Sequence, residues 1–65
     1  MNFYLRAGSG DLLPFEIEAP DVAAAVLAPE AENLPAGTRL ICLATNIVHA
    51  IASDGGWTIS LGVDF

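Results

Sequence analysis

Few residues in this chain could carry out catalysis. The 65 residues include one cysteine, Cys42, one histidine, His49, and no lysine. Nucleophilic catalysis needs a thiol, hydroxyl or amine that a neighbouring base activates, and acid–base catalysis needs a group that titrates near neutral pH. Cys42 and His49 would flank a tight hairpin turn and could approach each other, but Cys42 lies in an apolar run typical of a small buried side chain. We therefore expect no enzyme activity, and a structural or surface role for His49.

Metal and phosphate sites are not predicted either. A metal site would need further ligands at suitable spacing beside Cys42 or His49, and the acidic residues are scattered along the chain. Gly8-Ser9-Gly10 superficially resembles a phosphate-binding loop, but it lacks the lysine and the following helix that such a loop requires. The sequence thus predicts no cofactor and no metal, and a hairpin turn at residues 8–11.

The charge balance is the most informative feature of the composition. Eight acidic residues face only two basic ones, Arg6 and Arg39, which gives a net charge of −6. Such a chain repels phosphate groups, so direct binding to nucleic acid is not expected. We expect instead a larger protein partner with a basic surface of the kind that binds nucleic acid. The alternative is that the acidic residues only keep an apolar mini-protein in solution.

Length and composition predict one small domain over residues 1–65. Because 54% of the residues are hydrophobic, some apolar surface should remain exposed on so small a core, which makes a homodimer possible. A single cysteine cannot form an intramolecular disulfide, so we expect a cytoplasmic location. The longest uncharged stretch, residues 40–53, is shorter than the roughly 20 apolar residues of a membrane span.

The first half of the chain predicts a hairpin followed by a helix. Residues 2–7 alternate with the period of a half-buried strand, and a returning strand runs to about Glu18. Within it, Pro14 implies an edge position or a strand start. In this hairpin Arg6 would face Glu16. Residues 22–28 then form a short helix that Pro29 ends, and it covers one face of the sheet.

The second half contains one ambiguous segment. Residues 40–52 fit two strands joined by a turn at Thr45 and Asn46, but they also fit an amphipathic helix. The β-branched residues favour the strands. Residues 54–56 then turn the chain into a last strand whose alternation predicts burial of Trp57, Ile59, Leu61 and Val63. The fold class is α+β, a small and mostly antiparallel sheet with one short helix on one face, in the order ββαβββ.

The pattern of elements resembles that of a group of small phage proteins. The segment Phe15-Glu16-Ile17-Glu18-Ala19, followed by a short helix and by strands with a Gly-Gly-Trp turn, is similar to several anti-CRISPR inhibitors. This resemblance implies a stoichiometric inhibitor that binds a subunit of an RNA-guided complex and blocks the entry of target DNA. It also implies the cytoplasm of a host cell as the location if the chain is phage-encoded, and it carries over no catalytic residues.

Two hypotheses follow for the function. The first is an acidic interaction protein that inhibits a nucleic-acid-binding complex by occupying its basic surface. The second is a structural or assembly module that forms a homo-oligomer or a complex subunit through an exposed sheet edge. For the first, aromatic residues on the outer side of a strand are favoured as anchors, and acidic residues as steering groups; the predicted contact residues are Tyr4, Asp11, Glu16, Glu18, Asp21, Glu30 and Glu32.

Overall fold

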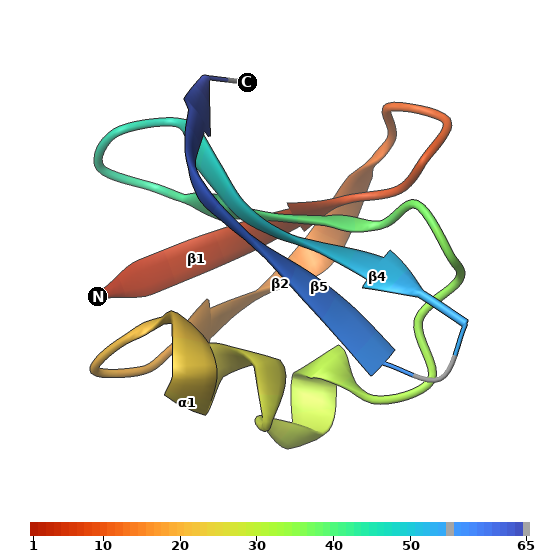
Figure 1. The fold of residues 1–65 in the computed structure, drawn as a ribbon, viewed down its shortest axis with the longest axis horizontal. Coiled ribbons are helices and arrows are strands. Elements are labelled where there is room, and N and C mark those ends of the chain that lie inside the picture. Colours follow the sequence, from red (N-terminus) through yellow and green to blue (C-terminus); the bar gives the residue numbers. More distant parts are fainter. Residues whose placement is uncertain (55, 65) are drawn as a thin grey trace.

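The chain folds into a five-stranded sheet with two short helical segments (Figure 1). In this computed structural model, residues 1–54 and 56–64 are described, with side chains for residues 1–54 and 56–59. The sheet order is β2-β1-β3-β4-β5, and all neighbouring strands are antiparallel. The predicted α+β fold and the order ββαβββ are confirmed. The elements are β1 (Asn2–Arg6), β2 (Leu12–Glu18), α1 (Val22–Val26), η1 (Pro29–Ala31), β3 (Arg39–Cys42), β4 (Ile47–Ser53) and β5 (Gly56–Asp64).

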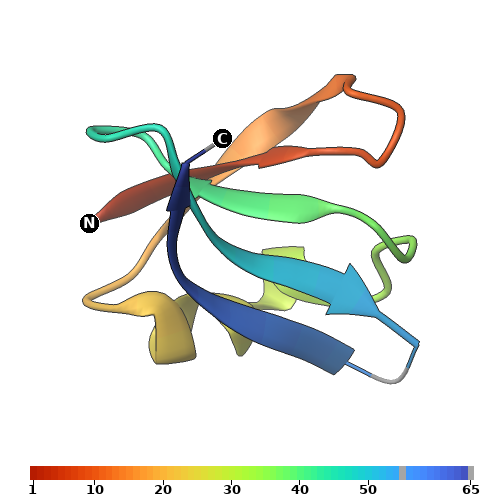
Figure 2. The ribbon, with the colours of Figure 1, turned by 45° about the horizontal axis from the view of Figure 1, so that its top comes forward.

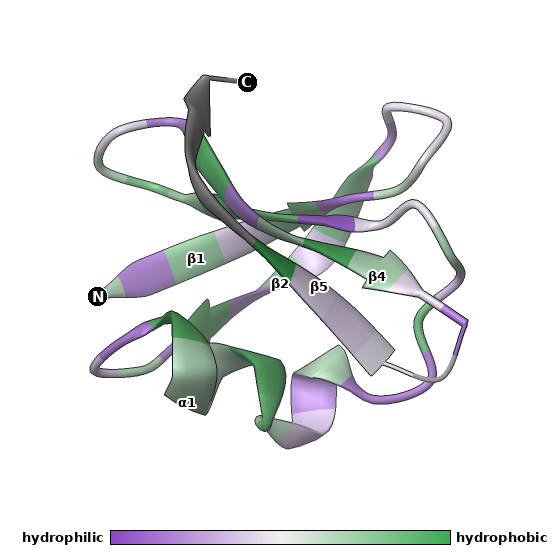
Figure 3. Ribbon diagram, viewed as in Figure 1, coloured by the Kyte–Doolittle hydropathy of each residue, from purple (hydrophilic) through white to green (hydrophobic). Residues whose placement is uncertain are grey.

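The core lies between the sheet and the helical segments, which cover one face of it (Figure 2). Alternation along β1 directs Phe3 and Leu5 into this core, and both are fully buried. Figure 3 shows the same alternation of hydrophilic and hydrophobic residues along the ribbon. Ile17 joins the core from β2 and Leu40 from β3. Because successive strand residues point to opposite faces, the remaining residues of β1 and β2 form an outer face.

The β1–β2 hairpin is closed by its glycine-containing turn, as predicted. Gly10 has a φ of 98°, a conformation that glycine adopts without steric cost. The Gly10 amide donates to the carbonyl of Ala7, and the Ala7 amide donates to the carbonyl of Asp11, both at 2.8 Å. β2 is an edge strand, which agrees with the position expected for Pro14.

The ambiguous segment forms two strands, so the strand interpretation is confirmed. β3 and β4 are joined by a turn in which Asn46 has a φ of 58°. Asparagine tolerates this left-handed region better than most residues do. The Asn46 amide donates to the Cys42 carbonyl at 2.8 Å. The strand preference of the β-branched residues in β4 therefore outweighs the helix-like spacing of the apolar residues in the same segment.

The helix is shorter than predicted. α1 begins after Asp21, whose carboxylate accepts a hydrogen bond of 2.8 Å from the Ala24 amide, and its C-cap is Leu27. Ala28 is extended because it precedes a proline, which disfavours helical geometry. Pro29 does not simply end the helix but begins the separate turn η1.

The outer face of the sheet is also partly buried, which the sequence did not predict. Ile41 pairs with Tyr4 on β1 and with Val48 on β4, so all three lie on the face opposite the core. Ile41 is nevertheless 0% exposed and Val48 only 5%. Conversely, Ile59 is 49% exposed, so its predicted burial is wrong. The expected burial of Leu61 and Val63 falls on side chains outside the described residues.

Candidate protein-binding surface

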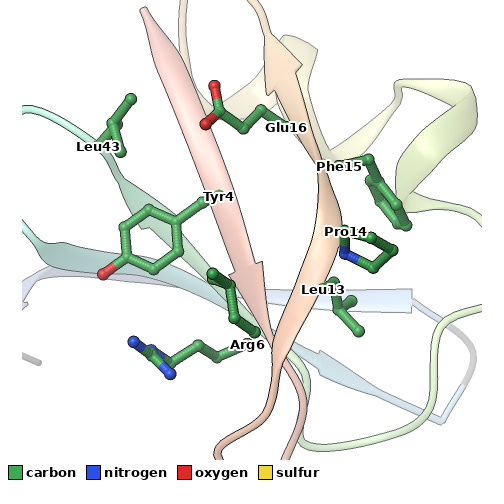
Figure 4. A pocket seen from close by; sticks show the side chains of 8 residues that line it. Tyr4, Arg6, Leu13, Pro14, Phe15, Glu16 and Leu43 are labelled. Atoms are coloured by element: carbon green, nitrogen blue, oxygen red, sulfur yellow. The ribbon is translucent and has the colours of Figure 1, made fainter.

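The outer face of the β1–β2 hairpin carries an open depression of about 650 Å³, which we call the outer hollow (Figure 4). Leu13 and Phe15 reach it from the core side of the edge strand β2. The outer hollow therefore follows β2 along its length rather than lying between two layers of the fold. Its other lining residues are Tyr4, Arg6, Leu12, Pro14, Glu16 and Leu43.

Tyr4 is held in place on this surface at two points. Its hydroxyl donates a hydrogen bond of 2.9 Å to the side-chain oxygen of Asn46 in the β3–β4 turn. The guanidinium carbon of Arg6 lies 5.9 Å from the centre of the Tyr4 ring, within the range of a cation–π contact. Arg6 also donates to the carbonyl of Gly10 at 2.7 Å. These contacts fix the rim of the outer hollow.

Glu16 and Glu18 extend the same face toward the far end of β2. Glu16 is the register partner of Tyr4, and Glu18 is the partner of Asn2. Both carboxylates are exposed. Because they are two residues apart on a strand, they stand about 6.6 Å from each other on one side of the sheet. The structure thus brings together three of the predicted contact residues, Tyr4, Glu16 and Glu18.

Arg6 does not face Glu16, so that expectation is wrong. Its cross-strand partners are Leu12 on β2 and Arg39 on β3. The hairpin closes with Arg6 opposite Leu12, and the register then shifts so that residues 13–15 of β2 lie opposite Leu5 alone and Glu16 lies opposite Tyr4. Such a bulge moves every later pair out of the simple hairpin register.

The other four predicted contact residues lie at separate places around the hairpin and the helical segment. Asp11 is in the hairpin turn and accepts a hydrogen bond of 3.2 Å from Ser9. Asp21 is the N-cap of α1, and Glu30 lies in η1, which contacts β2. Glu32 follows η1. All four are exposed.

A second hollow of about 450 Å³ lies beside η1, and we call it the η1 hollow. Trp57 lines it, and its indole nitrogen donates a hydrogen bond of 3.2 Å to the carbonyl of Ala31. Trp57 packs against the core but is only partly buried. Leu27, at the same hollow, is 80% exposed. Glu32 adds a carboxylate to its wall.

Sequence reasoning missed the apolar part of the outer hollow. Leu12 is 59% exposed and Leu43 is 45% exposed, and Pro14 is exposed as well. A signal for Leu12 was present, because residue 12 shares the outer phase of β2 with Glu16 and Glu18. Leu43 carried no such signal, since it lies just beyond the end of β3.

Cys42 and His49 have different neighbours. Cys42 is 5% exposed, as expected for a small buried side chain. A hydrogen bond from the Thr45 side chain lowers the pKa of its thiol, outweighing the opposite effect of burial, with further lowering by the backbone amides of Ala44 and Thr45. The His49 ring meets the ring of Phe3 edge-on, with centroids 6.0 Å apart.

Among the residues that the structure describes, no group of three or more histidine, cysteine, aspartate or glutamate side chains could hold a metal ion. Neither helical segment in the described part of the chain has the length and apolarity needed to cross a membrane. Comparisons of the chain with protein-family models, with curated proteins and with solved structures found no match.

Proposed function

We propose that this chain is an acidic interaction protein of the anti-CRISPR type. It binds stoichiometrically to a basic surface of a larger nucleic-acid-binding complex and blocks access of target DNA. Channels that hold nucleic acid are lined with lysine and arginine, and an acidic surface accelerates docking onto such a channel by electrostatic steering. The small phage inhibitors that the sequence resembles supply the biological setting of this proposal.

One observation carries the proposal: the charges differ in exposure according to their sign. All of the predicted acidic contact residues are exposed, whereas Arg6 and Arg39 are only partly exposed. Arg6 is further engaged by Gly10 and by the Tyr4 ring. An approaching protein therefore meets carboxylates that are more exposed than either arginine. The exposed acidic contact residues are Asp11, Glu16, Glu18, Asp21, Glu30 and Glu32.

The first test is capture from a bacterial lysate with the tagged protein at low and at moderate salt, followed by mass spectrometry. We expect a nucleic-acid-binding protein or complex that is lost as the salt concentration rises. Target DNA added in excess should compete with the protein for the basic surface of the captured complex. If the amount of captured protein changed neither with salt nor with added DNA, the proposal would be contradicted.

The second test is charge reversal with a matched control. Glu18→Lys and Asp54→Lys change the net charge by the same amount, and both residues are exposed, but Asp54 lies in the β4–β5 turn. We expect Glu16→Lys combined with Glu18→Lys to slow association with the captured partner by about tenfold or more at low salt. Glu18→Lys alone should slow it more than Asp54→Lys does. Equal effects of the two single variants would mean that only net charge matters.

A second function, assembly through a sheet edge, is favoured by one feature of β5. The two edge strands are β2 and β5. β2 carries Pro14 and two glutamates, which protect an edge against pairing. β5 spans Gly56–Asp64 and contains no proline, so a second copy or another subunit could add a strand there. This function predicts an oligomer whose mass, measured by light scattering after size exclusion, does not change with salt.

A further inference from the structure

The outer hollow combines exposed apolar walls with a carboxylate. Leu12 and Leu43 are 59% and 45% exposed, and both line the hollow. Removing such apolar surface from water lowers the free energy. Glu16 lines the same hollow, and Glu18 follows it along β2. An occupant that only carried positive charge would leave the two leucine side chains exposed to water. An occupant that was only apolar would gain nothing from the glutamates.

The rim of the outer hollow is already ordered before anything binds. The Tyr4 hydroxyl is bonded to Asn46 at 2.9 Å, and Arg6 is bonded to Gly10 at 2.7 Å. Tyr4 therefore has little side-chain freedom left to lose on binding. In Figure 4 the Arg6 guanidinium points away from Glu16, so the basic and acidic sides of the hollow are separate. A positively charged group can reach Glu16 without approaching Arg6.

The backbone of β2 is poorly suited to accept an added strand at this place. Pro14 has no amide hydrogen to donate, and the β1–β2 register is irregular over the same residues. A ladder of main-chain hydrogen bonds along β2 would be interrupted there. Recognition at the outer hollow must therefore depend on side chains.

We propose that the outer hollow binds an extended segment of the partner with an apolar side chain and, two residues away, a lysine or arginine. In an extended chain these two side chains lie on one side, about 6.6 Å apart. Leu43 donates its amide to the carbonyl of Asn2 and so lies at the same end of β1 as Glu18. The spacing in the extended segment therefore lets the apolar group contact Leu43 while the cation reaches Glu16 or Glu18. This inference rests on the proposed function, since it specifies which part of a basic protein the chain recognises.

The binding test uses peptides of defined sequence and amide chemical shifts of the isotope-labelled protein. The probe is acetyl-Lys-Gly-Leu-Gly-Lys-amide. One comparison peptide replaces leucine with alanine, and the other replaces both lysines with glutamate. We expect the probe to shift the amide signals of Leu12, Glu16 and Leu43 and to bind about tenfold more tightly than either comparison peptide. Equal binding of the alanine peptide, shifts centred on the η1 hollow, or no shifts with the probe would overturn the proposal.

A pair of leucine variants separates this inference from the proposed function. Leu43→Ser alters the outer hollow, whereas Leu27→Ser alters an even more exposed leucine at the η1 hollow. We expect Leu43→Ser to weaken both probe binding and capture of the lysate partner, and Leu27→Ser to affect neither. If Glu18→Lys abolishes capture while Leu43→Ser leaves it unchanged, the proposed function stands and the role of the outer hollow is refuted. If neither variant affects capture, both proposals fail.

Discussion

The Tyr4 hydroxyl donates a hydrogen bond of 2.9 Å to the side-chain oxygen of Asn46, across 42 positions of sequence. This bond links the outer face of β1 to the β3–β4 turn. Asn46 also has a φ of 58°. One residue thus meets two requirements at once, because it tolerates the left-handed backbone of the turn and supplies the acceptor that holds the aromatic ring.

These two roles of Asn46 can be separated by substitution. Tyr4→Phe removes only the hydrogen bond, which is exposed, and should lower the free energy of unfolding by about 0.5 kcal/mol. Asn46→Ala removes the same bond. It also places alanine in the left-handed region, where it lacks the local hydrogen bonding of asparagine, and this costs roughly 1–2 kcal/mol more. Urea denaturation followed by circular dichroism would measure both. Equal losses for the two variants would show that the backbone conformation of Asn46 is unimportant.

Burial of Ile41 on the outer face predicts an unexpectedly large loss of stability. Ile41 and Leu40 are both 0% exposed, although they point to opposite faces of the sheet. Truncation to alanine should therefore cost about 2–5 kcal/mol at either position. Ile51→Ala is the control, because Ile51 pairs with Arg39 on the same outer face but is 37% exposed. If Ile41→Ala destabilised the protein no more than Ile51→Ala, the outer face would contribute little to the fold.

The order of elements could be predicted from sequence because it depends on local signals. Alternation defines β1 and β2, glycines mark the first hairpin turn, and Asn46 marks the β3–β4 turn. These signals act over a few residues and do not require knowledge of which strands become neighbours. The edge position of β2 was one of two alternatives that Pro14 indicated, the other being the start of a strand.

The candidate site could be predicted only in part, because register and curvature are not local properties. The β1–β2 hairpin closes with Arg6 opposite Leu12 and places Glu16 opposite Tyr4, and the alternation of residues does not specify where the hairpin closes. Burial of Ile41 and exposure of Ile59 likewise depend on how the whole sheet twists. Tyr4 and Glu16 were predicted as contact residues, Tyr4 from its phase, but the leucines that line the same hollow belong to a surface that exists only after folding.

The N-cap of α1 yields a prediction that also bears on charge-reversal experiments. The Asp21 carboxylate accepts a hydrogen bond of 2.8 Å from the Ala24 amide. Asp21→Ala should lower the free energy of unfolding by about 1 kcal/mol, whereas Asp21→Asn, which keeps a capping oxygen, should lose much less. Thermal unfolding of the two variants would test this. If Asp21→Asn were as unstable as Asp21→Ala, the negative charge rather than the cap would be what matters, and binding assays should reverse Glu16 and Glu18 in preference to Asp21.

The environment of Cys42 predicts a pH dependence of stability with a definite sign. The hydrogen bond from Thr45 holds the pKa of the Cys42 thiol below its ordinary value of 9.0. Between the folded and unfolded pKa values the unfolded chain binds more protons, so stability rises with pH through this window. The gain is fully present above the unfolded pKa and is lost as the pH falls through the folded pKa. Urea denaturation at neutral and at alkaline pH would measure this gain.

Thr45→Val is the variant that assigns this effect to its cause. It removes the hydroxyl while keeping a β-branched side chain, so the pKa of the Cys42 thiol should rise and the alkaline gain in stability should shrink. The ultraviolet absorbance of the thiolate, titrated in the folded protein, reports the pKa directly. Because Cys42 is only 5% exposed, the folded protein should still react slowly with iodoacetamide at neutral pH despite the lowered pKa. Rapid alkylation would indicate that Cys42 is a reactive cysteine. An unchanged thiol pKa in Thr45→Val would show that the Thr45 hydroxyl does not stabilise the thiolate.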